Sequence, residues 1–324
     1  MTPFQVVAHS GLPGGLICNS SESDLGSLKN WALQNLDYVE ELLSTHGALL
    51  IRGLDIESAH EFKTACESFY PNLKPYKGGD SPRIELAGKV FTSTEYHSQL
   101  EVLLHNELSY AGWSPDRVMF GCLHPSETGG ETHLADGRSI HQNLKKNVKA
   151  RFDDLGIIYW QHLRDANGKP GTGLSWQDTF ETQDSASVEN YLLESDMQFQ
   201  WTDLGIRTSA RHQASMIHPV TQEVCWHNQA DQWHRDMPSV KDSVGNSSQP
   251  KDADAGIESL GNHVTFGDGS EIELEDLYHI RQVSQQCEVK FTWQKGDLLI
   301  IDNVMTMHGR KPFTGKRQIV VAMA

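Results

Sequence analysis

From about Arg83 onward, the sequence is a succession of short apolar segments separated by glycine, proline, asparagine and aspartate. Such runs, bounded by turn-forming residues, are typical of β-strands. We expect strands at residues 89–92, 101–106, 118–123, 157–162, 199–204, 224–227, 289–293, 298–301 and 319–324. Many short strands over a long stretch favour a sandwich or barrel over a doubly wound sheet. The fold class predicted is therefore mainly β with flanking helices.

Helical periodicity is confined to a few segments. Apolar residues recur at helical spacing over residues 21–44, and further helices are predicted at 58–69, 137–155, 186–195 and 274–286. A buried strand is expected at 48–54. We interpret residues 1–80 as a buttress for a core of residues 81–324, both within one domain. The segment 236–256 is polar and rich in Ser, Asp, Pro and Gly, and we expect a mobile surface loop that serves as a lid.

Charge and composition exclude several classes of partner. The net charge of −16 repels phosphate backbones and anionic lipid heads, so neither nucleic acid nor a membrane surface is an expected partner. A membrane span needs a run of about 18 apolar residues, and we find none. The first residues lack a basic segment followed by an apolar one, which favours a cytoplasmic protein. The five cysteines are scattered and odd in number, as expected for reduced thiols.

One short motif carries the chemistry. In LLHNELSY (103–110), His105 and Glu107 are two residues apart, so in a strand their side chains would share a face. His308 ends the apolar segment LLIIDNVMTMH and is a candidate third ligand. Two histidines and one carboxylate leave three positions open on an iron ion, which an oxygenase requires. A His-x-Glu pattern is common by chance, and a surface histidine and glutamate would be the ordinary alternative. HExxH, the zinc-hydrolase pattern, is absent.

Two further residues suit a carboxylate ligand. Arg317 precedes the returning strand, and its guanidinium offers a planar fork to a carboxylate. The Thr132 hydroxyl, in GGETHLAD, can share that carboxylate. Taken alone, Arg317 is better explained by a solvated surface ion pair, and Thr132 by a hydroxyl at the end of a strand.

Several ordered segments resemble the TauD/TfdA superfamily, in the branch of clavaminate synthase-like and SyrP-like proteins. They include SPRIELAGKVFTSTEY (81–96), LLHNELSYAGWSPDRVMFGCLHPSETGGETHLADGR (103–138), GLSWQDTFET (173–182), VCWHNQADQWH (224–234), VTFGDG (264–269) and WQKGDLLIIDNVMTMHGRKPFTGKR (293–317). The resemblance implies a double-stranded β-helix, or jelly roll, and an oxygenase that uses Fe(II), 2-oxoglutarate and dioxygen. It implies metal ligation by His105, Glu107 and His308, with Thr132 and Arg317 at the cosubstrate.

The sequence departs from the family pattern at two places. Many members carry Asp where Glu107 stands, whereas the halogenases carry Ala or Gly, so a halogenase is not expected. Relatives often show two adjacent arginines where this chain has Arg317 and Gln318. Arg310 and Lys316 are therefore alternative candidates for binding the carboxylate of 2-oxoglutarate.

By resemblance, the substrate is a small amino-acid derivative. Candidate contacts are Arg83, Glu95, Tyr96, Gln99, Asn106, Trp176, Gln177, Asn228 and Trp233, with Arg83 suited to an anionic group. Core packing is the alternative for the tryptophans, and a turn is the alternative for Asn228. His227 and His234 lack metal-site spacing. Hydroxylation is the expected reaction, with oxidative cyclisation or desaturation as the alternative and a catalytically silent binding protein as a third.

Overall fold

The structure, a computed structural model, describes residues 4–7, 13–18, 23–81, 83–93, 96–168, 174–238 and 261–324. Its helices are α1 (Leu25–His46), α2 (Ala59–Phe69), α3 (Gly137–Asn143), α4 (Lys146–Leu155), α5 (Trp176–Phe180), α6 (Ser185–Glu194), α7 (Ala230–Trp233) and α8 (Leu274–Gln286). No described helix has the length and apolar character that crossing a membrane requires.

Two sheets form the centre of the molecule. The larger one has the order β1 (Phe4–Val7), β2 (Gly14–Cys18), β3 (Ala48–Arg52), β16 (Leu298–Asp302), β6 (Arg117–His124), β19 (Gln318–Met323) and β4 (Phe91–Thr92). The smaller one has the order β15 (Glu288–Phe291), β8 (Thr132–Asp136), β17 (Thr306–Arg310) and β5 (Val102–His105). The predicted buttress thus adds its strand β3 to the same sheet, antiparallel to β16.

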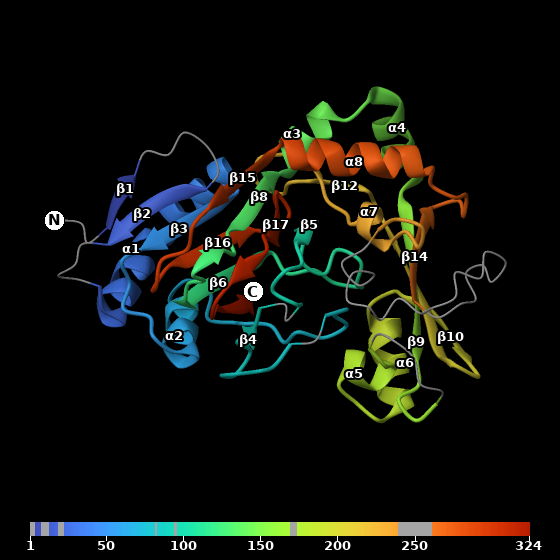
Figure 1. The fold of residues 1–324 in the computed structure, drawn as a ribbon, viewed down its shortest axis with the longest axis horizontal. Helices are drawn as coiled ribbons and strands as arrows, with labels where there is room; N and C mark the ends of the chain where they lie inside the picture. The colour runs from blue at the N-terminus through green and yellow to red at the C-terminus, as the bar shows by residue number, and fades with distance from the viewer. Residues whose placement is uncertain are drawn as a thin grey trace.

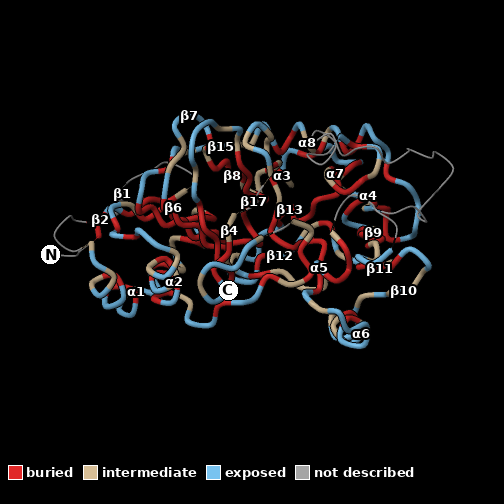
Figure 2. The backbone as a smooth tube through the Cα atoms, turned by 60° about the horizontal axis from the view of Figure 1, so that its bottom comes forward, coloured by how far each residue is buried: buried red, intermediate tan, exposed pale blue. Residues whose placement is uncertain are grey.

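Alternation along the central strands divides the apolar residues between two faces of the larger sheet. Phe120 and Leu299 belong to a core that also contains Leu134 and Met307 of the smaller sheet. Met119 and Ile300, one residue away, belong instead to the core beneath α1 and α2. Figure 1 shows these two helices beside β3, β16 and β6, and Figure 2 shows the sheet strands buried.

A third sheet lies at the right of Figure 1, away from the two central sheets. A four-stranded antiparallel sheet has the order β10 (Gln198–Thr202), β11 (Gly205–His212), β9 (Ile157–Arg164) and β14 (Gly261–Phe266). Two pairs complete the set, β12 (Ser215–Ile217) with β13 (Val224–Trp226) and β18 (Phe313–Thr314) with β7 (Thr128–Gly129).

Local signals explain where the helices begin and end. The Asp24 side chain accepts hydrogen bonds from the backbone N–H groups of Gly26 and Ser27, so α1 begins at Leu25 rather than at residue 21. Gly47 ends it in a left-handed conformation with φ of 73°. The single helix predicted over residues 137–155 is wrong, because Leu144 is extended and separates α3 from α4.

Two other predictions concern the loop and the thiols. Of the predicted lid, only Asp236, Met237 and Pro238 belong to the described residues, and positions 239–256 lie outside them. All five cysteines are free thiols, of which Cys287 is the least buried.

Candidate metal centre

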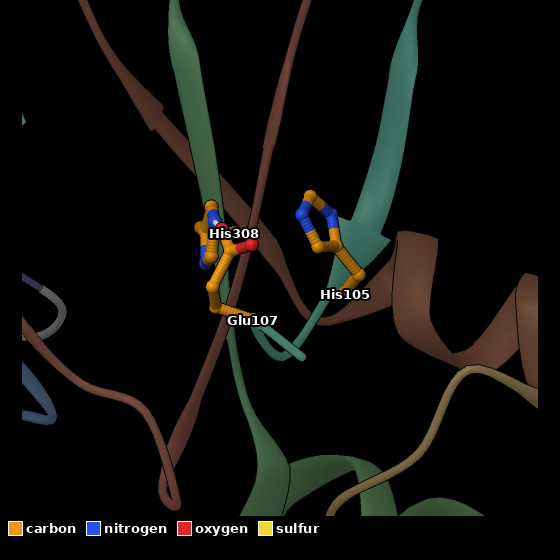
Figure 3. A group of neighbouring side chains, drawn as sticks. All are labelled: His105, Glu107 and His308. Atoms are coloured by element: carbon orange, nitrogen blue, oxygen red, sulfur yellow. Dashed lines mark ion pairs between the residues drawn. The ribbon is translucent and has the colours of Figure 1, made fainter. Parts of the chain in front are cut away.

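Strand pairing brings His308 to His105 and Glu107, about 200 residues earlier in the chain. His105 is the last residue of β5, and its register partner in β17 is His308. Glu107 follows β5 by two residues and turns back toward both imidazoles (Figure 3). One nitrogen or oxygen of each side chain lies within 4.8 Å of the others. The structure therefore assembles the predicted set of two histidines and one carboxylate.

The route to this convergence differs from the predicted one. Glu107 lies in a turn rather than in a strand, and Leu108 next to it has a positive φ of 56°. Asn303, between β16 and β17, fixes this turn. Its Oδ1 accepts from the Glu107 N–H at 2.8 Å, and its Nδ2 donates to the Glu107 carbonyl at 3.0 Å. Nothing in the sequence pattern pointed to Asn303.

Arg83 compensates the charge of Glu107. Its Nη2 donates to both carboxylate oxygens, at 2.9 and 2.8 Å, and the two side chains are each only 4% exposed. Burial alone would raise the pKa of Glu107, but the positive charge of Arg83 holds it well below its usual range. The guanidinium lies over the Tyr76 ring, 4.2 Å from the centroid, while its Nε and Nη1 are buried without a hydrogen-bond partner.

Both histidines are suited to ligate a metal. The Nδ1 of His105 lies 2.8 Å from the Leu103 carbonyl oxygen, so Nδ1 carries the proton and Nε2 presents its lone pair. Burial, and then the neighbouring His308, lower the pKa of His105 to about 3, which keeps the imidazole neutral. The Nε2 of His308 lies 3.6 Å from a Glu107 oxygen, and its Nδ1 is buried without a partner. This donor set fits an Fe(II) ion with open coordination positions.

The predicted cosubstrate residues lie on neighbouring segments. Thr132 begins β8 opposite Arg310 of β17, and its hydroxyl accepts a hydrogen bond from the Trp293 indole at 3.0 Å. Arg317 precedes β19 and donates from Nε to the Gly130 carbonyl at 3.2 Å. Among the residues that the structure describes, no acidic side chain forms an ion pair with Arg317. Burial, and then the charge of Arg310, lower its pKa to about 9.

Arg310 and Lys316, the alternative candidates for binding that carboxylate, are placed differently. Arg310 donates to the backbone carbonyls of Tyr96, His97 and Leu100. Lys316 is exposed. Arg310 is thus tied to three backbone carbonyls, whereas the Arg317 side chain donates to one among the described residues, which leaves Arg317 the better placed of the two to bind an anion.

The candidate substrate residues divide into two groups. Asn106 lies between the proposed ligands His105 and Glu107 and donates to the Asn303 carbonyl, whereas Tyr96 hydrogen-bonds Ser81 and Gln99 donates to the Phe313 carbonyl. Trp233 stacks on Tyr110 at 4.4 Å.

The other candidates serve packing or turns. Trp176 packs on Trp201 in a separate small core, and the Gln177 side chain donates a hydrogen bond to the Asp165 carboxylate. The Asn228 amide is bonded to the backbone of Ala214 and Ala230.

The remaining candidates lie elsewhere. Glu95 lies outside the described residues. His234 lies with His263 and Glu271 rather than with His227, and Arg235 donates to that Glu271.

The family profile of the taurine catabolism dioxygenase TauD, TfdA family matches residues 10–323. The chain belongs to this family. It is 32% identical over 315 residues to the dapdiamide synthesis protein DdaC of Enterobacter agglomerans, covering 97% of this chain and 92% of that protein. A clavaminate synthase-like protein of Arabidopsis thaliana is 27% identical over 293 residues, covering 88% and 84%. The solved structure of AAD-2 with Mn(II) and N-oxalylglycine aligns with a TM-score of 0.57 and 14% identity, covering 99% and 96%.

Membership confirms the predicted fold class, a mainly β protein with a jelly-roll core and flanking helices. It also confirms that the chain is a dioxygenase that uses Fe(II), 2-oxoglutarate and dioxygen on a small molecule.

Proposed function

We propose that His105, Glu107 and His308 hold the iron of this dioxygenase. The observation that carries the proposal is the set of three donor atoms within 4.8 Å of one another, on segments about 200 residues apart in the chain. A neutral His105, held by the Leu103 carbonyl, and an ionised Glu107 are already in the protonation states that metal binding requires.

Arg317 and Thr132 are proposed to receive the distal carboxylate of 2-oxoglutarate. A partly buried guanidinium with no acidic partner among the described residues supports this role. When bound, iron and 2-oxoglutarate supply dioxygen activation and hydrogen abstraction from the substrate, with release of succinate and carbon dioxide. The protein binds both compounds, orients them and excludes water.

The proposed substrate is a small amino-acid derivative. The similarity to a dapdiamide synthesis protein and to a clavaminate synthase-like protein supports this class. Arg83 has two buried N–H groups without partners, which suit the carboxylate of such a compound. Hydroxylation is the proposed outcome, and oxidative cyclisation or desaturation is the alternative. We further propose a single catalytic domain over residues 1–324 that works in the cytoplasm without nucleic-acid or membrane partners.

The first experiment incubates the protein with Fe(II), ascorbate, 2-oxoglutarate and a panel of amino acids and N-substituted amino acids. Succinate and product mass are measured together. A gain of one oxygen indicates hydroxylation, and a loss of two hydrogens indicates cyclisation or desaturation.

Two variants test the metal ligands directly. His308→Ala and Glu107→Ala should lose Mn(II) binding, whereas His60→Ala, which changes an exposed histidine on α2, should retain it. Tight Mn(II) binding by either ligand variant would exclude the proposed triad.

A further inference from the structure

The Thr132 hydroxyl at the proposed cosubstrate site is bonded to a buried tryptophan. Thr132 begins β8, and its side-chain oxygen accepts a hydrogen bond from the indole N–H of Trp293 at 3.0 Å. The two residues are 161 positions apart in the chain and are only 4% and 5% exposed. The indole has a single polar group, which can donate but not accept, so the direction of this bond is fixed.

The hydrogen of the same hydroxyl is left to be donated elsewhere. A threonine hydroxyl has one hydrogen and two lone pairs, and the bond from Trp293 uses one of the lone pairs. Within the described part of the chain, Trp293 is the one hydrogen-bond partner of the Thr132 side chain. The hydroxyl therefore presents itself as a donor, and donors bond more strongly to an ionised oxygen than to a neutral one.

Strand pairing directs this hydroxyl to the face on which the proposed ligand His308 lies. Thr132 and Leu134 are two residues apart on β8, so their side chains share a face. Leu134 is the register partner of His308, and Thr132 is the register partner of Arg310. Partners in an antiparallel ladder project to the same side of the sheet. The Thr132 hydroxyl is therefore on the side of β8 that faces the proposed metal centre.

Packing anchors Trp293 independently of this hydrogen bond. It follows β15 by two residues, and its ring lies edge-on to Phe291, with centroids 4.9 Å apart. Phe291 ends β15 and is the register partner of Thr132 in β8. The Trp293 side chain also belongs to the core that the two central sheets share. A donor held by packing in this way fixes the hydroxyl before any ligand arrives.

We propose that Trp293 is a positioning residue for 2-oxoglutarate, which holds the Thr132 hydroxyl so that its hydrogen is donated to the distal carboxylate. The inference rests on the proposed function, in which Thr132 and Arg317 receive that carboxylate. Arg317 contributes the positive charge, whereas Thr132 contributes a directed hydrogen bond. Without the indole N–H, rotation of the threonine side chain could exchange its hydroxyl for its methyl group.

The test measures binding rather than turnover. Mn(II)-loaded protein is titrated in a calorimeter with 2-oxoglutarate and with 2-oxopentanoate, which carries a methyl group in place of the distal carboxylate. Trp293→Phe keeps an aromatic ring in the core and removes the N–H. It should weaken 2-oxoglutarate binding roughly three- to tenfold, the effect of one hydrogen bond, and leave the Kd of 2-oxopentanoate unchanged. Equal weakening of both compounds would indicate a distorted site and would overturn the inference.

Trp160→Phe is the matched control. The Trp160 indole donates to the Thr265 hydroxyl, also at 3.0 Å, but between β9 and β14 in the third sheet. This variant should bind both compounds as the unaltered protein does. A loss of 2-oxoglutarate affinity equal to that of Trp293→Phe would overturn the inference, because any indole–threonine bond would then have the same effect.

A double-mutant cycle tests whether Trp293 acts through Thr132. Thr132→Val removes the hydroxyl and keeps the shape of the side chain. Trp293→Phe should add no further loss of 2-oxoglutarate affinity to Thr132→Val, whereas two losses that multiply would overturn the inference. Thr132→Ser keeps the hydroxyl without the methyl group that restricts its rotation. It should bind 2-oxoglutarate almost as tightly as the unaltered protein, because the indole still holds the hydroxyl. A loss as large as that of Thr132→Val would overturn the inference even if Trp293→Phe did not fold.

Failure of the proposed function gives a different result. If neither Thr132→Val nor Arg317→Met weakened 2-oxoglutarate binding, the distal carboxylate would lie elsewhere and the cosubstrate assignment itself would be wrong. A loss with Thr132→Val but none with Trp293→Phe would overturn only the role of Trp293.

Discussion

Replacing Arg83 by methionine should destabilise the metal-free protein strongly. The substitution removes the Nη2 atom that lies 2.9 and 2.8 Å from the two Glu107 oxygens, and it leaves the carboxylate in a site where the side chain is only 4% exposed. Removing one partner of a buried ion pair typically costs about 3–5 kcal/mol, because the remaining charge has neither water nor a counter-ion. Methionine keeps much of the apolar contact with the Tyr76 ring, so most of the loss is electrostatic.

The measurement is urea-induced unfolding at pH 7.5, in chelator and again with excess Mn(II). In chelator, Arg83→Met should lose about 3–5 kcal/mol of unfolding free energy. The double variant Arg83→Met, Glu107→Gln should recover most of this loss, because no buried charge remains. With Mn(II), the single variant should lose less, because the cation replaces Arg83 as the partner of Glu107.

The reasoning would be refuted by a loss below about 1 kcal/mol, the range of exposed ion pairs. It would also be refuted if the double variant were no more stable than the single one. Arg83→Lys keeps the positive charge and should lie between the unaltered protein and Arg83→Met, which provides a measurable comparison if the methionine variant fails to fold.

Three other predictions concern separate parts of the structure. Arg317→Met should raise the 2-oxoglutarate concentration for half-maximal succinate formation about 10- to 100-fold, whereas Lys146→Met, on the exposed face of α4, should not. Gly309→Ala should weaken Mn(II) binding in a titration, because a Cβ there would lie 2.4 Å from the Val102 carbonyl oxygen and would push β17 from β5. Burial raises the pKa of Asp297 to about 6, so the folded state binds the extra proton and loses about 3 kcal/mol as pH rises from about 4 through 6. Asp297→Asn should remove that loss in unfolding experiments at several pH values, and an unchanged pH dependence would contradict the assignment.

The sequence predicted most directly the strands that are continuously apolar. β6 and β16 are buried on both faces, so their residues form uninterrupted hydrophobic runs. β11 and β17 were not predicted, because GIRTSARH and TMHGR contain glycine and polar residues whose burial depends on neighbouring strands. Such strands form because neighbouring strands pair with them and bury them, which their own composition does not reveal.

The candidate site divides in the same way. The three proposed ligands could be identified because a metal requires specific residue types, which leave a pattern in the sequence. The pairing of Arg83 with Glu107, and the unpartnered buried Nδ1 of His308, depend on which side chains the fold brings together and which it leaves without a hydrogen bond. No spacing rule encodes that, so only the structure could reveal it.

The pairing of β5 with β17 also has a consequence for how the protein matures. His105 and Glu107 are synthesised long before His308, and the register between these strands is what completes the proposed ligand set. A nascent or partly unfolded chain therefore presents an incomplete ligand set, which binds a redox-active ion more weakly than the full one. If these three residues bind iron, the site forms only when β5 and β17 pair within the packed β-core, so the metal is held only where the folded protein surrounds it.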